Sequence, residues 1–397
     1  MTRDTGKKEI YLDHAATTGV KQEVLEEMMP YFSLRYGNPS SIYKLGRESR
    51  QAIDMARERT ALALGVSPSE VFFTGSGTES LNWAIKGAAE ANSSKGKHII
   101  TSNIEHHAVL HTCLYLQKKG YDVTFLPVDR NGLLTAEQVF KAIRKDTILI
   151  TVMTANNEIG TIQPVAEIGA IAKEHGILFH TDAVQAIGNI PINLKTLPVD
   201  MLSLSAHKFY GPKGAGVLYL RKGSRITDIL QGGGQEKGRR PGTENVPAIA
   251  GLGKAIELAS QNIEKYNAHM LNLRNKLIDK VLAAIPYTRL NGDREKRLPG
   301  NANFSFEFIE GESLLLLLDM KGISASSGSA CTSGSLDPSH VLLAIGLPHE
   351  IAHGSLRVTF GETNTEDDID ALTEALIFSV GKLREMSPLY ENAAKNI

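Results

Sequence analysis

A single cysteine stands in a stretch of small residues near the end of the chain. Cys331 lies in "SSGSACTSGSLDPSH" (326–340), where glycine, serine and threonine surround it. A buried free cysteine behaves as a small hydrophobic residue and normally has large apolar neighbours. The composition of 326–340 instead predicts a loop. A thiolate is a strong nucleophile, so Cys331 is a candidate for covalent chemistry.

The second cysteine, Cys113, has a different setting. It recurs with Val109 and Leu116 at helical spacing in "AVLHTCLYLQKKG", and Gly120 can end that helix. We therefore expect Cys113 to pack in the core. Two cysteines far apart in sequence give no disulfide framework, which indicates a reducing, cytoplasmic setting.

One lysine and one aspartate follow apolar runs that resemble strands. Lys208 stands in "LSLSAHKFYGPKGAG", without an acidic neighbour. A lysine drawn to a desolvated site has a lowered pKa and can form a Schiff base; Lys213, between Pro and Gly, fits a surface turn better. Asp182, with Gln185 after it, either pairs with a protonated ring nitrogen or caps a helix. Ligands bind at the carboxyl ends of strands in open α/β sheets, so Lys208 and Asp182 are expected at one edge.

Two segments have the chemistry to hold anions. "VFFTGSGTESLNWAI" (71–85) reads as a strand, a glycine turn and a helix, in which Gly77 permits close approach of a ligand and Thr78 is expected to cap the helix. The free N–H groups and the helix dipole favour an anion there. The alternative is an ordinary turn that binds nothing. Arg357, in strand-like "SLRVTF", is either ion-paired or binds a carboxylate with its planar fork.

Three histidines occur together in "SNIEHHAVLHT" (102–112). His106 ends a strand-to-helix turn and is placed to lie over a ligand. His107 and His111 are four residues apart and are expected on a solvated helix face, with Glu105 favouring the helix dipole. No metal site is expected, because no set of carboxylates or cysteines converges on these histidines.

Two further loops are candidates for binding. In "TANNEIGTIQP", Asn156 and Asn157 either offer their amides to a ligand or form a turn. The glycine-rich "QGGGQEKGRRPGTEN" (231–245) is either a solvated surface loop or one whose basic groups and Thr243 reach an anion in a neighbouring subunit.

The elements that must position these residues follow a strand–helix alternation. Seven short β-branched runs predict a largely parallel sheet covered by helices on both sides: 71–74, 98–102, 122–128, 147–154, 177–184, 201–206 and 216–220. After about residue 260 a long helical stretch, strand-like 302–308 and 355–360 and further helices predict a smaller α+β domain. We assign 16–260 to the large domain, and 1–15 with 261–397 to the small domain, which carries the cysteine loop at 326–336.

Composition excludes several classes of protein. The chain has 397 residues, 42% hydrophobic and 22% charged, with a net charge of −1. These values are ordinary for a globular protein and give no reason to expect nucleic acid or a membrane as partner. The apolar runs are too short to span a bilayer, and the first ten residues lack the apolar region of a secretory signal.

Taken together, these motifs resemble the cysteine desulfurases of the NifS/IscS type, which are class V aminotransferase-like enzymes of pyridoxal-phosphate fold type I. The resemblance runs from Tyr11 to about Asp370, and the long segment around Cys331 is similar to the first desulfurase group rather than to the SufS-type group. The motifs are "YLDHAATT", "YGNPSSIY", "TGSGTES", "EHHAVL", "NNEIGT", "HTDAVQ", "SAHKFYGPKG", "RRPGTEN" and "SSGSACTSGSLDPSHV".

The resemblance implies the aspartate-aminotransferase-like fold, pyridoxal 5'-phosphate as cofactor, and a role for each matched residue. Lys208 would form the Schiff base, Asp182 would hold the pyridine nitrogen protonated, and His106 would stack on the ring and take part in proton transfer. Gln185 and Asn157 would contact the phenolic oxygen. The phosphate would be bound by Gly77, Thr78, Ser205, His207 and, from the other subunit, Thr243, and the substrate carboxylate by Asn157 and Arg357.

The implied reaction removes sulfur from L-cysteine and gives L-alanine and a persulfide on Cys331. An imidazolium would help to form the thiolate, and His106 is the nearest candidate. The implied partners are a second copy of the chain and an iron–sulfur scaffold protein of the IscU/NifU kind. The alternatives are another enzyme of this fold, such as an aminotransferase or a selenocysteine lyase, and a scaffold that has lost catalysis. The small residues of 326–336 predict that mobility of this loop is part of the function.

Overall fold

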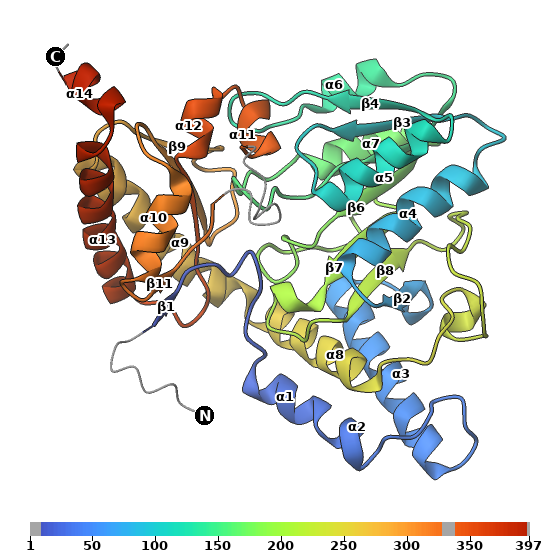
Figure 1. The fold of residues 1–397 in the computed structure, drawn as a ribbon. Coiled ribbons are helices and arrows are strands. Elements are labelled where there is room, and N and C mark those ends of the chain that lie inside the picture. The colour runs from blue at the N-terminus through green and yellow to red at the C-terminus, as the bar shows by residue number, and fades with distance from the viewer. Residues whose placement is uncertain (1–8, 328–337, 395–397) are drawn as a thin grey trace.

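A seven-stranded sheet forms the centre of the larger part of the protein (Figure 1). The computed structural model describes residues 9–327 and 338–394. The strand order is β2-β8-β7-β6-β5-β3-β4, and all neighbours are parallel except that β8 runs antiparallel to β2 and β7. This confirms the predicted α/β fold with a mainly parallel sheet. The strands are β2 Val71–Thr74, β3 His98–Ser102, β4 Asp122–Leu126, β5 Thr147–Thr151, β6 Leu178–Asp182, β7 Met201–Ser205 and β8 Gly216–Leu220.

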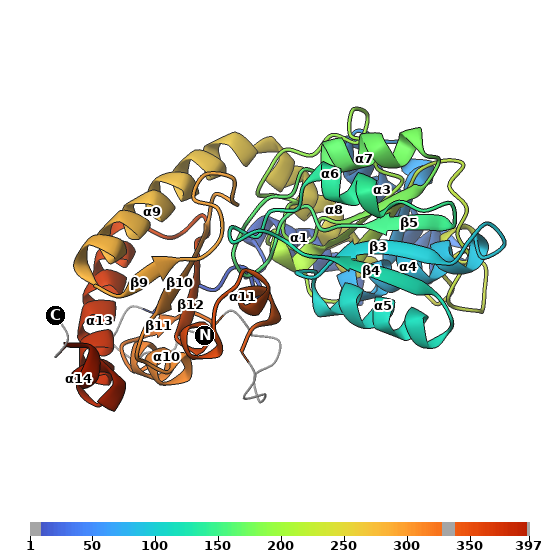
Figure 2. The same ribbon diagram turned by 90° about the horizontal axis from the view of Figure 1, so that it is seen from above.

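Helices cover both faces of this sheet, as a near-continuous apolar strand pattern requires. One apolar cluster joins the sheet to α4 and α5, and another joins it to α3, α6, α7 and α8; Figure 2 shows the two layers. Cys113 on α5 is fully buried beside Val109 and Leu116, which confirms its packing role. The helices are α1 Gln22–Met28, α2 Pro30–Ser33, α3 Lys44–Leu64, α4 Gly77–Ala91, α5 His107–Lys118, α6 Ala136–Ala142, α7 Val165–Glu174 and α8 Val246–Gln261.

The remaining elements form a smaller α+β unit with its own core. A three-stranded antiparallel sheet, β12-β10-β9, packs with α9, α10 and α13, and the short pair β1-β11 brings Ile10 and Leu12 into the same core. The elements are β1 Ile10–Tyr11, α9 Ile263–Ala284, β9 Thr288–Leu290, β10 Asn301–Phe306, α10 Gly311–Asp319, β11 Ile323–Ser324, α11 His340–Ala344, α12 His349–His353, β12 Ser355–Thr359, α13 Glu366–Glu385 and α14 Pro388–Ala394.

A helix from the C-terminal part of the chain packs against the large unit. Val341 and Leu342 of α11 pack in one apolar cluster with Ile104, Met153 and Ile159, which lie at the ends of the large sheet. A segment of the C-terminal part therefore completes the wall of the large unit. The division into 16–260 and 1–15 with 261–397 remains our proposal.

The sequence predicts neither a membrane span nor a metal site, and both features can be compared with the described part of the chain. Within it, no helix is both long enough and apolar enough to cross a membrane. Among the same residues, no group of three potential metal ligands converges. The cytoplasmic location stays a prediction.

Candidate functional site

A cavity of about 330 Å³ opens at the carboxyl ends of β6 and β7. Its size lies in the range of small-molecule and cofactor sites. Of the predicted cofactor and substrate residues, all except Thr243 line it. The lining includes Gly77, Thr78, His106, Asn157, Asp182, Gln185, Ser205, His207, Lys208 and Arg357.

Lys208 reaches this cavity from the short 3-10 turn Ala206–Lys208 that directly follows β7. Its Nζ donates to the carbonyl oxygens of Ala15 and Ala16 at 2.6 and 2.7 Å. The segment that precedes α1 therefore fixes the amine at the edge of the cavity. Lys213, by contrast, is exposed, as its place between Pro and Gly predicted.

Asp182 is the last residue of β6 and carries a buried carboxyl group. Its Oδ1 accepts the N–H of Val184 at 2.9 Å. Burial raises the pKa of Asp182 to about 6, while the Val184 N–H and the charge of Lys208 lower it. A protonated ring nitrogen next to this carboxyl group would favour its ionised form and so oppose the effect of burial on its pKa.

The phosphate end is the first turn of α4. Ser76 caps this helix, because its Oγ accepts the N–H of Glu79 at 3.1 Å. The prediction that Thr78 is the cap was wrong by two residues, since the helix already begins at Gly77 and Thr78 lies in its first turn. The first N–H groups of a helix have no partner within it, so this end favours an anion.

His106 is the N-cap of α5 and lines the cavity. Its Nδ1 accepts the N–H of Ala108 at 3.1 Å, which places the ring proton on Nε2. Burial, and then the charge of Lys208, lower the pKa of His106 to about 4. The lowered pKa favours the neutral ring at pH 7, and a positive charge on His106 during the reaction stays a prediction. A neutral ring suits the acceptance of a proton.

Arg357 brings the small unit into the site from β12. Its Nη2 donates to Asp13 at 2.8 Å and its Nη1 to the Asn157 carbonyl at 3.0 Å. The side chain is buried, so the guanidinium is both ion-paired and directed to the cavity. The ion-paired alternative is therefore confirmed, and carboxylate binding by the same guanidinium stays a prediction. The backbone of Arg357 also pairs with that of Ser326, where the cysteine-containing segment begins.

The two asparagines that follow β5 have different roles. The side-chain Oδ1 of Asn156 accepts the N–H groups of Glu158 and Ile159, both at 2.9 Å. Asn156 therefore forms the turn. Asn157 lines the cavity and lies next to Arg357 through its carbonyl oxygen.

Two expectations about the histidine segment need correction. Glu105 does not face the helix dipole; its buried carboxyl accepts from Ser102 at 2.6 Å and from the Met153 N–H at 3.1 Å. Burial raises its pKa to about 8. His107 is not fully solvated either, because it lines the cavity with its ring 4.7 Å from that of His340.

Two predicted residues are not placed in the cavity. Thr243 is exposed and does not line it. Cys331 and most of the loop 326–336 lie outside the described residues, so neither the position of this thiol nor the predicted mobility is tested. Of the described residues on either side of it, His340 lines the cavity, and Ser326 pairs through its backbone with Arg357, which lines the cavity.

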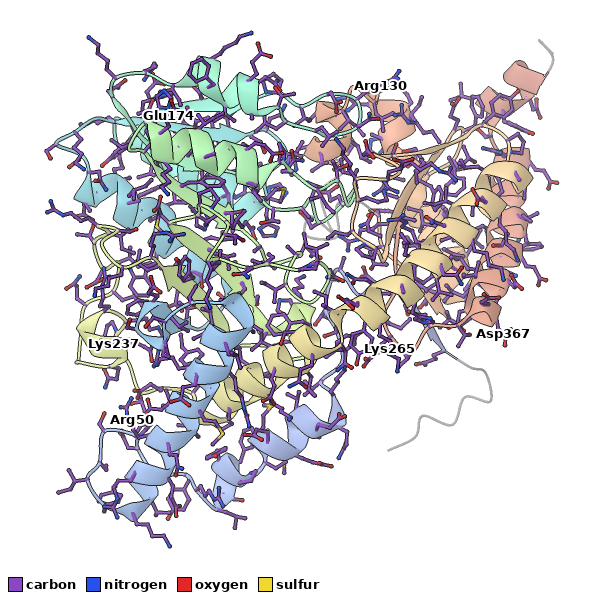
Figure 3. All side chains as sticks on the ribbon, turned by 180° about the vertical axis from the view of Figure 1, so that it is seen from behind. Arg50, Arg130, Glu174, Lys237, Lys265 and Asp367 are labelled. Atoms are coloured by element: carbon purple, nitrogen blue, oxygen red, sulfur yellow. The ribbon has the colours of Figure 1, made fainter. Side chains whose placement is uncertain are left out.

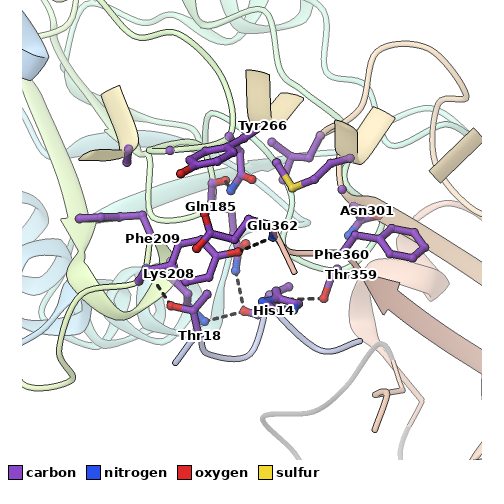
Figure 4. A pocket seen from close by; sticks show the side chains of 18 of the residues that line it. His14, Thr18, Gln185, Lys208, Phe209, Tyr266, Asn301, Thr359, Phe360 and Glu362 are labelled. Carbon is purple, nitrogen blue, oxygen red and sulfur yellow. Dashed lines mark hydrogen bonds between the residues drawn. The ribbon is translucent and has the colours of Figure 1, made fainter. Parts of the chain in front are cut away.

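A second, smaller cavity of about 50 Å³ shares Ala15, Gln185 and Lys208 with the first (Figure 4). It lies between the two units. Lys21 pairs with Glu362 at 2.7 Å across this junction and donates to Tyr266 Oη at 2.9 Å. These contacts join the two walls of the site.

The larger cavity fits the pyridoxal phosphate that the resemblance implies. Gly77 lines the cavity, and a side chain there would meet Val184 Cγ2 at 3.0 Å and Ser205 Cβ at 3.3 Å, so glycine lets the first turn of α4 lie close to the ends of β6 and β7. An anion site, a buried carboxyl group and a lysine therefore line one enclosed space. These three features match a phosphate, a pyridinium nitrogen and a carbonyl carbon.

Sequence reasoning missed several residues of the site. His340 and Glu158 line the cavity, and Asp13 holds Arg357. Burial raises the pKa of Glu158 to about 7, and its carboxylate accepts a hydrogen bond from Ser339. "YLDHAATT" and "NNEIGT" contain two of these residues, but no local spacing indicates which distant side chain they contact.

Comparisons with known proteins agree with this site. The class-V aminotransferase profile matches residues 10–372. The chain is 59% identical to "Cysteine desulfurase IscS" of Methanosarcina thermophila, covering 97% of this chain and 95% of the relative. It is 56% identical to the protein of the same name from Clostridium botulinum strain Hall, covering 98% of each. A solved "NifS-like protein" superposes with a TM-score of 0.87 at 41% identity, covering 96% of this chain and 99% of that one. The chain belongs to the cysteine desulfurases of the class-V aminotransferase family.

Proposed function

We propose that this protein takes sulfur from L-cysteine, releases L-alanine and carries the sulfur as a persulfide on Cys331 for iron–sulfur cluster assembly. The observation that carries the proposal is one cavity with Lys208 and Asp182 on one side and Arg357 on the other. Its family relationship supports the same reaction, since its relatives are named cysteine desulfurases.

The cavity residues would divide the work of holding the cofactor. Pyridoxal phosphate, when bound, withdraws electrons from the substrate α-carbon and so weakens its bond to hydrogen. Asp182 would face the ring nitrogen, and His106 would lie against the ring. Gln185 and Asn157 would contact the phenolic oxygen. The phosphate would be held by Gly77, Thr78, Ser205 and His207.

The same residues would orient the substrate and move its protons. The Arg357 fork, already held by Asp13 and the Asn157 carbonyl, would bind the substrate carboxylate together with the Asn157 side chain. Lys208 Nζ would take the proton from the substrate α-carbon and later return a proton to the carbon skeleton that becomes alanine. His106, neutral at pH 7, would accept a proton at the ring.

Sulfur transfer requires a thiolate. The Cys331 thiolate would attack the substrate sulfur; an S–S bond forms, the C–S bond breaks, and the carbon that keeps the electron pair takes up a proton to become alanine. Cys113 cannot replace it, because it is fully buried and burial raises the pKa of its thiol to about 12. Access of Cys331 to the substrate is supported by His340, which lines the cavity, and by Ser326, which pairs with the cavity residue Arg357.

A homodimer is part of the proposal. The helices α1 and α2 and the turn before α3 lie together at one side of the large unit (Figure 1). Several of their large apolar side chains are exposed. A single chain rarely leaves so many together. A second copy would cover them and bring a partner's Thr243 to the phosphate. The exposed side chains are Leu25, Met29, Phe32, Leu34, Tyr36, Ile42 and Tyr43.

The test is an assay of alanine and persulfide with L-cysteine, run with and without an iron–sulfur scaffold protein as acceptor. We expect one alanine for each sulfur transferred. The Cys331→Ala variant should keep the yellow cofactor absorbance yet form no persulfide. Sulfur release that survives in Cys331→Ala would show that the nucleophile is assigned wrongly. A protein that stays colourless with added pyridoxal phosphate would contradict the whole proposal.

A further inference from the structure

The loop that carries Thr243 is held on both sides of that residue. Three positions before it, Arg240 donates Nε and Nη2 to the two carboxylate oxygens of Glu79 at 2.7 and 3.0 Å. One position after it, Glu244 pairs with Arg50 at 3.2 Å, on the side of the molecule where Figure 3 labels Arg50. Thr243 itself is exposed. The two ion pairs on either side of Thr243 therefore hold this part of the loop in place and leave the Thr243 side chain exposed to solvent.

Glu79 belongs to the phosphate end of its own subunit. It lies in the first turn of α4, its Oε2 accepts the N–H of Gly75 at 2.8 Å, and its own N–H binds the cap residue Ser76. The Arg240 fork is therefore attached to the carboxylate that shapes the turn before Gly77. Both side chains are only about one-fifth exposed, with values of 23% for Arg240 and 20% for Glu79. A two-pronged pair shielded to this degree fixes geometry better than a surface ion pair does.

The base of the same loop is anchored deep in the fold. The buried carboxylate of Glu236 accepts from Arg57 at 2.6 and 2.8 Å and from the Phe73 N–H at 2.8 Å. Glu236 and Lys237 have φ angles of 45° and 60°, which side chains other than glycine rarely adopt. Such backbone persists only where the surroundings over-determine it. The loop is therefore a built feature rather than a mobile surface segment.

We propose that Arg240 is a positioning residue that docks on Glu79 of its own subunit so that Thr243 reaches the cofactor phosphate of the partner subunit. The proposal rests on the homodimer and cofactor proposed above. Thr243 is exposed and does not line the cavity of its own chain, which leaves its side chain accessible to a second copy. The charge of Arg240 is already balanced by Glu79, so Arg240 acts through position. Pre-fixing the tip lowers the cost of ordering it on contact.

This arrangement links the two phosphate sites. Each Glu79 shapes the α4 turn in its own subunit and holds the arginine that directs Thr243 to the other. Loss of Arg240 should therefore weaken cofactor retention in the neighbouring subunit, not in its own. If Arg240 instead acted directly on the phosphate in its own subunit, its loss would weaken cofactor retention in that subunit and not in the neighbour.

The first experiment follows loss of the Lys208–cofactor absorbance during dialysis of purified homodimers. We expect Arg240→Ala and Glu79→Gln to lose cofactor about tenfold faster than the parent, the scale of one hydrogen bond to a charged group. Gln at 79 still offers an oxygen to the Gly75 N–H. Arg239→Ala is the matched control, because Arg239 pairs with Asp228 at 3.0 Å and not with Glu79. Equal loss in the control, or no loss in Arg240→Ala, would overturn the proposal.

The second experiment uses mixed dimers with one Lys208→Ala subunit, purified through two different tags. Only the Lys208 subunit gives the absorbance, so retention is read at one site. With Arg240→Ala in the Lys208 subunit, we expect parental retention. With Arg240→Ala in the Lys208→Ala subunit, we expect the fast loss. The reverse pattern, equal loss in both, or a chain that does not dimerise would overturn the proposal. Alanine formation by the parent enzyme, measured separately, would show whether the proposed function itself holds.

Discussion

The two sides of the cavity are built in different ways. On the side of the large sheet, Asp182 ends β6 and Lys208 follows the adjacent strand β7, so one sheet delivers both. On the side of the small unit, Arg357 is held by Asp13 and by the Asn157 carbonyl, which are 344 and 200 residues away in the chain. The pairing of two strands that follow each other in the chain places Asp182 and Lys208 on the first side, although the distant Ala15 and Ala16 carbonyls also hold the Lys208 amine. Long-range contacts place the second.

This difference assigns different tasks to the two sides. The side of the large sheet carries the groups that would hold and tune the cofactor, and its strands are buried on both faces. The Arg357 side would hold the substrate carboxylate, and it depends on how the two units meet. Changes to the first side should therefore affect the cofactor, whereas changes to the second should affect cysteine affinity.

The largest effect is expected on the side of the large sheet. Lys208→Ala removes the amine that the Ala15 and Ala16 carbonyls hold, which is the group we propose to form the Schiff base. We expect alanine formation from cysteine to fall by at least about 1,000-fold, because covalent and proton-transfer roles are lost together. The absorbance of the lysine–cofactor link should also vanish. Retention of that absorbance would show that another residue holds the cofactor.

A smaller effect, of a different kind, is expected on the Arg357 side. Arg357→Ala should raise KM for cysteine about 100-fold, and Arg357→Lys about tenfold, because lysine keeps the charge but loses the fork. Both variants should keep the cofactor absorbance of the parent. Steady-state kinetics with parallel spectra checks this. Loss of cofactor in Arg357→Lys would contradict the proposal that only the side of the large sheet holds the cofactor.

On the side of the large sheet, Asp182 should also make the stability of the apoprotein depend on pH. Burial raises the folded-state pKa of Asp182 to about 6, from 3.8. The folded state then binds the proton more tightly, so this group lowers stability as pH rises from about 4 to 6, by about 3 kcal/mol at most. Thermal unfolding of apo Asp182→Asn should show a flatter pH dependence in that range. Apo Glu105→Gln is the comparison, because the pKa of Glu105, raised from 4.5 to about 8, makes that group lower stability over a range that continues above pH 6; Glu105→Gln should therefore flatten the pH dependence up to about pH 8, whereas Asp182→Asn should flatten it only below about pH 6. An unchanged slope in Asp182→Asn would contradict the assignment.

The smallest effect is expected away from both sides. Cys113 is fully buried, so Cys113→Ala should cost about 1 kcal/mol of unfolding free energy and leave alanine formation unchanged. Chemical denaturation and the alanine assay together check this. A marked loss of activity with intact folding would give this thiol a role that its burial does not predict.

The sheet, and the meeting of Lys208 and Asp182 at its edge, could be predicted from sequence because strand composition and strand ends are local signals, whereas Ser205 and His207 were assigned only through the family resemblance. All seven predicted strands occur in one sheet, and Lys208 and Asp182 share its edge. The misplaced cap at Thr78 reflects the choice between two hydroxyl residues on either side of Gly77, which only backbone geometry resolves. The neutral state of His106 depends on burial and on Lys208, and neither effect can be read from local spacing. Asp13 was missed because its partner lies at the other end of the chain.

The central claim is that sulfur leaves cysteine in this cavity and arrives on Cys331. The most direct measurement is the mass of the Cys113→Ala protein after one turnover with L-cysteine under non-reducing conditions. Its remaining thiol is Cys331. The account predicts one added sulfur atom on the peptide that contains Cys331, matched by one alanine. Alanine without that added sulfur, or the added mass on another peptide, would contradict it.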